Sequence, residues 1–181
     1  FDPVNLELEN SFFLGIVGAN GVGKSTLANC LLGKQKFSGN ILLPCTTDKI
    51  GYLSQSQNLT FDLIVKDLVV MGLYTTLKQF ESYHTKHFKR VLQQLRALKI
   101  DHLYLRNFNT LSGGEQQLVW LAQTLIKEPE LIILDEPTSS LDIHNKTLLF
   151  SHLQRLHTTA GISIICITHD IYLLKKIKGM L

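Results

Sequence analysis

The chain has 181 residues, of which 45% are hydrophobic and 18% are charged, with a formal net charge of +3. This length and composition are typical of one soluble globular domain with a substantial core. No apolar run in the sequence is long enough to span a bilayer as a helix, so a role at a membrane would require docking to a protein that spans it.

The first predicted element is a buried strand over residues 12–17, followed by a glycine-rich loop. Residues 18–26 read Gly-Ala-Asn-Gly-Val-Gly-Lys-Ser-Thr, which fits the Gly-x-x-x-x-Gly-Lys-Ser/Thr pattern of a phosphate-binding loop. Its glycines let successive backbone N–H groups point at an anion, Lys24 can reach the β- and γ-phosphates, and the Ser25 hydroxyl can bind Mg²⁺. A helix predicted over residues 25–32 places the phosphates at a helix N-terminus.

The middle of the chain, about residues 60–110, is predicted to be a helical insert. Gln55 ends the run Ile-Gly-Tyr-Leu-Ser-Gln just before it, where a glutamine could contact Mg²⁺ and the attacking water. Apolar residues within 88–98 recur at helical spacing. Residues 75–110 carry seven Lys and Arg against two acidic residues, a balance of +5. That charge could bind nucleic acid, but it interleaves with the apolar stripe, which favours a solvated helix face.

Residues 111–117, Leu-Ser-Gly-Gly-Glu-Gln-Gln, form a second candidate anion-binding helix N-terminus. Ser112 is expected to cap a helix over residues 115–127, and Gly113 and Gly114 expose its first amides. One nucleotide does not need two phosphate-binding helix ends from one chain. A head-to-tail homodimer, in which each chain's motif closes the other chain's site, accounts for both.

Two further apolar strands, over residues 131–134 and 162–167, each lead into polar residues. Such strands, separated by helices, predict a parallel sheet whose ligands bind beyond the carboxyl ends of the strands. Asp135 follows the first strand and suits Mg²⁺, and the adjacent Glu136 suits a general base for the attacking water. His169 follows the second strand, where it can hydrogen-bond a γ-phosphate.

Other metal or disulfide chemistry is not indicated. Cys30, Cys45 and Cys166 lack metal-ligand spacing, and we expect buried, reduced thiols. His84 and His87 have a helical spacing that could hold a metal, but no acidic or thiol partner is nearby in the sequence. We therefore expect both histidines to be surface residues.

The chain resembles the ATP-binding cassette (ABC) ATPases over essentially its whole length. Six motifs stand in the family's order, namely Walker A (18–26), the Q-loop (Gln55), the signature (111–117), Walker B (131–136), the D-loop (139–142) and the H-loop (His169). The resemblance implies an α/β fold, a P-loop NTPase (RecA-like) core with a mostly parallel sheet plus an ABC-type helical subdomain. Residues 1–58 and 115–181 would form the catalytic core, and residues 59–114 the helical subdomain.

The resemblance also implies the role of each site residue. Catalysis would fall to Glu136, His169 and Gln55, and Mg²⁺ would be held by Ser25, Gln55 and Asp135. ATP would be bound by the chain's own Gly18, Asn20, Gly21, Gly23, Lys24, Ser25 and Thr26, and by the partner's Ser112, Gly113, Gly114 and Asp142. Asp142 would also couple the two sites of the dimer. The chain starts close to Walker A and stops soon after His169, so we expect some terminal family residues to be missing and assign no adenine-stacking residue.

The implied function is that of a transporter's ATPase subunit, a homodimer docked to integral membrane permease subunits at the cytoplasmic face of the inner membrane. Such a subunit does not contact the transported substrate, and nucleic acid is not an expected partner. Residues 64–74 are similar to a segment of metal and metal-chelate importers. We therefore expect import of an iron-siderophore, haem, cobalamin, zinc or manganese. The alternative is a soluble ATP-switched module acting on nucleic acid or the ribosome.

Overall fold

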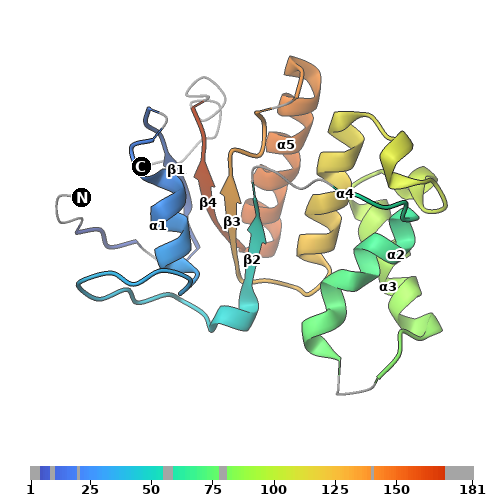
Figure 1. Ribbon diagram of the computed structural model, residues 1–181, viewed down its shortest axis with the longest axis horizontal. Coiled ribbons are helices and arrows are strands. Elements are labelled where there is room, and N and C mark those ends of the chain that lie inside the picture. The colour runs from blue at the N-terminus through green and yellow to red at the C-terminus, as the bar shows by residue number, and fades with distance from the viewer. Residues whose placement is uncertain are drawn as a thin grey trace.

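The computed structural model describes residues 5–8, 11–19, 21–54, 59–77, 81–139 and 141–169. Within these ranges four strands form one sheet in the order β1-β4-β3-β2 (Figure 1), and every neighbouring pair is parallel. The strands are β1 (Phe13–Ile16), β2 (Ile50–Leu53), β3 (Leu131–Asp135) and β4 (Ser163–Ile167). The parallel sheet expected from the sequence is therefore confirmed.

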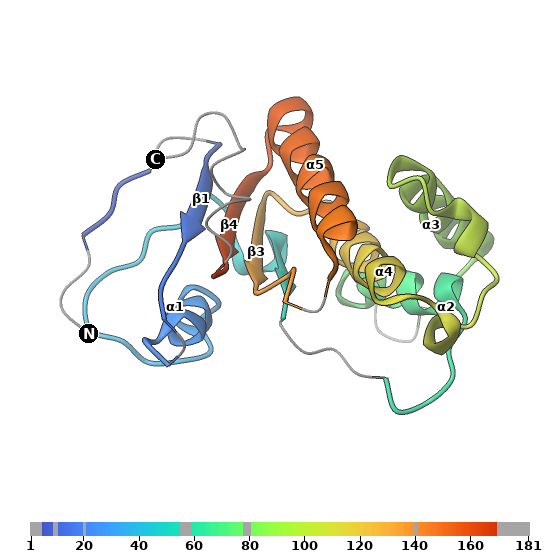
Figure 2. The same cartoon turned by 90° about the horizontal axis from the view of Figure 1, so that it is seen from above.

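The two central strands are fully buried because helices cover both faces of the sheet. Successive residues of a strand point to opposite faces. Accordingly, Leu131 and Ile133 of β3 pack with α1 (Lys24–Leu31), whereas Ile132 and Leu134 pack in the cluster that contains α5 (Ile143–Ala160). Figure 2 shows α1 and α5 on opposite sides of the sheet.

The prediction of a buried first strand is only partly correct. In β1, Phe13 is buried, but the next three residues are half-buried, and Val17 beyond the strand is 44% exposed. The reason is position, since β1 is an edge strand of the described sheet and pairs with β4 alone. Local composition does not distinguish an edge strand from a central one.

The helical part contains α2 (Val65–Val70), a 3₁₀ segment (Met71–Thr76) and α3 (Thr85–Ala97), all packed beside α4 (Gly113–Leu125). In Figure 1 these helices stand together at one side of the sheet. Helix α4 packs on α2 and α3 but also on strand β2. The predicted domain boundary at residue 114 thus falls at the start of a helix that contacts both parts, and it stays a prediction.

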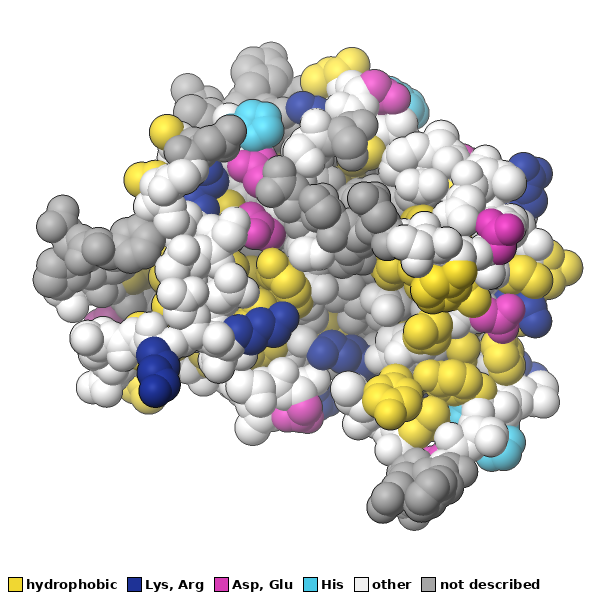
Figure 3. Space-filling model, in the orientation of Figure 1, with side chains coloured by type: hydrophobic (Ala, Val, Ile, Leu, Met, Phe, Trp, Pro, Cys, Tyr) yellow, Lys and Arg dark blue, Asp and Glu magenta, His cyan; other side chains and the backbone are white. Residues whose placement is uncertain are grey.

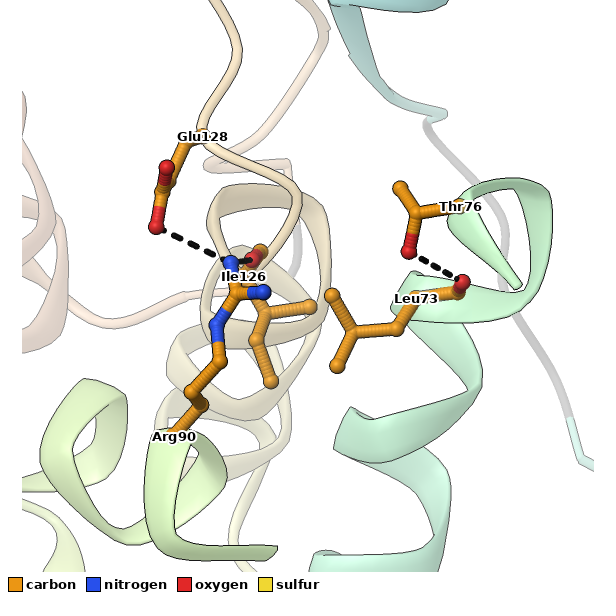
Figure 4. A network of polar contacts seen from close by, with 5 residues as sticks. All are labelled: Leu73, Thr76, Arg90, Ile126 and Glu128. Atoms are coloured by element: carbon orange, nitrogen blue, oxygen red, sulfur yellow. Dashed lines mark hydrogen bonds and ion pairs between the residues drawn. The ribbon is translucent and has the colours of Figure 1, made fainter. Parts of the chain in front are cut away.

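Polar contacts fix the carboxyl end of α4 to its surroundings. The Arg90 guanidinium of α3 donates to the Ile126 carbonyl and to the Glu128 carboxylate, both at 2.9 Å (Figure 4). Lys127 donates from Nζ to the carbonyl of Ile50 in β2 at 2.5 Å, and burial lowers the pKa of its ammonium. The end of α4 is therefore attached to α3 on one side and to the sheet on the other.

The predictions for histidine and cysteine burial are partly wrong. His84 is exposed as expected, but His87 is only 6% exposed because its ring folds back over the start of α3, where Nδ1 accepts the His84 N–H and the ring packs against Tyr83. That burial lowers the pKa of His87. All three cysteines are free thiols, and Cys166 is buried, but Cys30 and Cys45 are only half-buried.

Gly72 allows the 3₁₀ segment to approach α4 closely, and its replacement by alanine should be costly. A Cβ at this position would lie 2.1 Å from the Gln123 carbonyl oxygen and 2.7 Å from Ile126 Cγ2. We expect Gly72→Ala to destabilise the fold by about 3 kcal/mol, since backbone blocks the added methyl group. Thermal unfolding should show a Tm lower by about 6–12 °C.

The matched control is Gly33→Ala, because Gly33 has a positive φ of +68° but no atom of a described residue within 4 Å of an added Cβ. It tests backbone strain without steric overlap, and about 1 kcal/mol is expected. Equal losses in the two variants would contradict the close approach at Gly72.

Candidate functional site

The glycine-rich loop connects β1 to the first turn of α1. Gly21 and Gly23 have φ of +79° and +102°, a left-handed conformation that residues with side chains rarely adopt. Gly23 is the N-cap of α1, so the amides of the following first turn lack acceptors within the helix. Lys24 donates from Nζ to the carbonyl of Gly18 at 2.8 Å and to that of Ala19 at 3.0 Å. The loop therefore places the first-turn backbone amides of α1 and the Lys24 ammonium group where they can surround one anion.

A cavity of about 400 Å³ joins this loop to the end of β3. It is lined by Gly21, Gly23, Lys24, Ser25, Thr26, Asp135 and Glu136. The lining comes from segments far apart in the sequence, brought together because parallel strands have their carboxyl ends at one edge of the sheet. The cavity thus collects the residues that the sequence assigns to phosphate, Mg²⁺ and the general base.

Two carboxylate oxygens of residues that line this cavity are buried and have no hydrogen-bond partner in the part of the chain that the structure describes. Asp135 is 4% exposed and Glu136 is 7% exposed, and the orphan atoms are Asp135 Oδ1 and Glu136 Oε1. A buried carboxylate oxygen is costly unless a donor or a cation faces it. Mg²⁺ typically takes one or two protein carboxylates, waters and substrate phosphates. Asp135, together with the Ser25 hydroxyl in the same lining, fits that ligand set.

Glu136 is held in an unusual backbone conformation. Its φ is +50°, a region that costs a non-glycine residue on the order of 1–3 kcal/mol and that is concentrated at functional sites. The Glu136 N–H donates to the Ile167 carbonyl of β4 at 2.8 Å, which anchors the strained residue.

His169, two residues beyond β4, contacts the other oxygen of Glu136. Its Nδ1 lies 2.8 Å from Glu136 Oε2, and the His169 side chain is 57% exposed. An ionised carboxylate only accepts hydrogen bonds, so Nδ1 carries the proton and donates it. Sequence analysis assigned His169 to the γ-phosphate and missed this contact, because parallel strands predict that both residues lie at one edge of the sheet but not that their side chains touch.

The signature residues lie apart from this cavity. Ser112 caps α4, and Glu115 Oε2 accepts hydrogen bonds from the Ser112 N–H at 2.8 Å and from its hydroxyl at 2.7 Å. Hydrogen bonds from Ser112 lower the pKa of the Glu115 carboxyl. The predicted cap is confirmed. Figure 1 shows α1 and α4 on opposite sides of the sheet, so this turn does not reach its own chain's cavity.

The structure brings together most of the predicted site residues. Gly18 lies beside the cavity, with its carbonyl bound to Lys24, and His169 is attached through Glu136. Asp142 is elsewhere, as the N-cap of α5. The predictions for Asn20 and Gln55 fall outside the described residues.

Residues 1–139 match the family model described as ABC transporter. The molybdate import ATP-binding protein MolC of Haemophilus influenzae is 35% identical over 171 residues, an alignment covering 94% of this chain and 66% of that protein. The zinc uptake system ATP-binding protein ZurA of Listeria innocua is 32% identical over 181 residues, covering 94% of this chain and 70% of that protein. The chain therefore spans about two thirds of the length of these relatives.

Solved structures agree in fold over nearly the whole chain. A protein assigned to the metal-chelate type of ABC transporter, in an inward-facing conformation, superposes with a TM-score of 0.89 at 34% identity, covering 94% of this chain and 68% of that one. A dimeric bacterial ABC transporter cassette superposes with a TM-score of 0.80 at 27% identity, covering 98% of this chain and 83% of that one. Among the described residues, no helix combines the length and apolar character needed to cross a membrane.

Proposed function

Because the chain belongs to the ABC transporter family, we propose that it is the subunit that binds and hydrolyses ATP to power import of a metal ion, metal oxyanion or metal chelate through a membrane permease. The cavity that joins the glycine-rich loop to Asp135 and Glu136 is the observation that carries the catalytic part of the proposal. The substrate class rests on the relatives, which are named for molybdate and zinc uptake. These names favour a transporter over the nucleic-acid module.

The glycine-rich loop would hold the phosphates of ATP. Its amides and the α1 macrodipole favour negative charge, and Lys24 would exchange its bonds with Gly18 and Ala19 for phosphate oxygens. Ser25 and Asp135 would hold Mg²⁺, which when bound neutralises charge on the β- and γ-phosphates. These groups bind and orient the substrate before any bond breaks.

Glu136 would act as the general base. Its Oε2 is occupied by His169, whereas its Oε1 is buried and has no hydrogen-bond partner among the described residues, so Oε1 is the oxygen left to take a proton from an attacking water. The strained backbone and the bond to Ile167 fix the direction of the carboxylate. His169 thus orients the base.

A second copy of the chain would complete each site. The Ser112 turn presents a helix N-terminus but does not line its own chain's cavity. In a head-to-tail dimer it would face the partner's ATP, and the similar dimeric cassette supports this arrangement. The Ser112 hydroxyl would then leave Glu115 to donate to a phosphate oxygen.

The permease would dock on the helical part of the chain. Apolar side chains are exposed there, including Phe61 (56%), Met71 (46%) and Tyr74 (75%). Figure 3 shows hydrophobic side chains gathered over this part of the molecule. A contiguous exposed apolar patch marks a protein-binding surface, and docking here would hold the chain at the cytoplasmic face of the membrane.

Reconstitution in vesicles with the cognate permease tests the proposal. Phosphate release and ATP-dependent uptake of zinc, molybdate or a ferric chelate are expected. Absence of ATP hydrolysis by the reconstituted complex would contradict the enzymatic part. Hydrolysis without uptake of these three substrates or of haem, cobalamin or manganese would contradict the importer assignment.

His169 variants should separate its two possible contacts. His169→Asn retains a donor near the position of Nδ1, whereas His169→Gln extends its amide toward the position of Nε2. If holding Glu136 is the main role, His169→Ala should lower kcat by about 100-fold and His169→Asn should recover more activity than His169→Gln. Steady-state phosphate release measures all three variants. The opposite order would assign His169 mainly to the γ-phosphate.

A further inference from the structure

The first turns of α4 and α5 are in direct contact through Gly114 and Asn145. A Cβ on Gly114 would lie 2.3 Å from Asn145 Cγ, 2.5 Å from Oδ1 and 2.6 Å from Nδ2. Because all three amide atoms are at nearly the same distance, the flat face of the Asn145 amide covers the Gly114 Cα. No residue with a side chain fits at position 114 while Asn145 keeps this position.

Asn145 is itself held by Asp142, the N-cap of α5. Asp142 Oδ1 accepts the Asn145 N–H at 2.9 Å, and Oδ2 accepts a hydrogen bond from Asn145 Nδ2 at 2.8 Å. The backbone hydrogen bond from Asn145 is the main reason why the pKa of Asp142 is lowered. Both carboxylate oxygens thus fix the amide that rests on Gly114.

The Asp142–Asn145 pair follows the catalytic carboxylate, Glu136, closely in the sequence. After Glu136 the described residues make two short-range backbone hydrogen bonds, from the Ser139 N–H to the Glu136 carbonyl at 3.3 Å and from the Leu141 N–H to the Thr138 carbonyl at 3.2 Å. Leu141 is buried, which anchors the chain beside Asp142. Hydrogen bonds and burial therefore hold described residues on both sides of the connection between Glu136 and the pair Asp142–Asn145.

We propose that Asn145 is a positioning residue that joins the Ser112–Gly114 turn to Asp142 of the same chain, which follows Glu136 in the sequence. The inference rests on the proposed function, because these two elements are the ones expected to act on the partner's ATP. Because Asn145 holds these two elements together, a movement that begins at Glu136 in one ATP site would shift the Ser112–Gly114 turn, which closes the ATP site of the partner. A displacement of about 1 Å at a positioning group can cost about 100-fold in rate, which gives this contact its importance.

A double-mutant cycle tests the contact without nucleotide. Gly114→Ala should lower Tm strongly, and the loss should be much smaller when Asn145→Ala has removed the overlapping amide. Such non-additivity is the signature of residues in direct contact. Additive changes in Tm would overturn the proposed packing. This cycle is independent of ATP hydrolysis and therefore of the proposed function.

ATP hydrolysis tests the positioning role. We expect Asn145→Ala to lower kcat by about tenfold while the Kd for ATP of the isolated chain stays unchanged, since Asn145 is not among the residues that line its own chain's cavity. Asn145→Asp keeps the flat shape but sets a second carboxylate against Asp142, so it should be as slow as Asn145→Ala. Thr147→Ala, an exposed position on the same turn of α5, is the matched control and should retain the parent rate.

The outcomes separate the two proposals. If the parent chain hydrolyses ATP and Asn145→Ala keeps its kcat, the positioning role is wrong and the proposed function stands. If the parent chain does not hydrolyse ATP, the proposed function fails while the cycle still decides the contact. Should Asn145→Ala fail to fold, Asn145→Ser, which retains a short donor, gives the same comparison.

Discussion

Glu136→Gln should reduce ATP hydrolysis by about 10²–10⁴-fold and leave ATP binding intact. The amide has nearly the same shape and can still meet His169, but it cannot take a proton from water. Glu136 Oε1, a buried oxygen that no described residue contacts by a hydrogen bond, is the atom whose basicity is lost. Phosphate release measures the first effect, and binding of a fluorescent ATP analogue measures the second.

The same variant should accumulate as an ATP-bound dimer, because closure proceeds while hydrolysis does not. Size-exclusion chromatography with and without ATP would detect it. Glu130→Gln is the matched control, since Glu130 is an exposed carboxylate at the opposite end of the same strand and should tolerate the change. Hydrolysis by Glu136→Gln at the parent rate would refute the general-base assignment.

Lys24→Ala should instead abolish tight ATP binding, with a Kd raised by about 10²–10⁴-fold. Two charge-assisted hydrogen bonds to phosphate are lost, each contributing about 1.5–3 kcal/mol. The fold should not suffer, because Lys24 begins α1 and alanine is a good helix former. Equilibrium binding of the fluorescent analogue and a melting curve without nucleotide check both statements.

Lys36→Ala provides the control for charge alone, since Lys36 is exposed and does not line the cavity. Its Kd for ATP should equal that of the parent chain. If Lys36→Ala weakened binding as much as Lys24→Ala, general electrostatic attraction, and not a specific phosphate contact, would explain the effect. The Lys24 and Glu136 variants together separate ATP binding from ATP hydrolysis.

Much of the fold could be predicted from the sequence because its central strands carry a strong signal. The predicted strand 131–134 and the helix 115–127 differ from β3 and α4 by no more than two residues at either end. The errors arose where packing overrides local pattern. Strand β1 is half-buried because it lies at the edge of the described sheet. His87 is buried because its ring folds back to accept the His84 N–H, a contact that helical periodicity does not encode.

The predictions for the site divide in the same way, into features that follow from topology and features that depend on side-chain contacts. Parallel topology gathers the ends of strands, so the proximity of Lys24 and Asp135 in one cavity could be foreseen from the order of the elements. The Glu136–His169 contact requires the positions of side chains and was missed. Asn145 belongs to no motif, and its contact with Gly114 depends on how two helix ends meet in space.

Because its carboxyl end is held in place, helix α4 can rotate as a rigid rod about that end. Arg90 and Lys127 hold that end, while Ser112 lies at the opposite tip. The 13 residues of α4 extend about 20 Å, so a tilt of about 3° around the fixed end moves the tip by about 1 Å. A permease pressing on the helical part would need only this small rotation to bring the tip in or out of alignment with a phosphate. The stiffness of α4 would then determine how closely the position of Ser112 follows the movement of the permease.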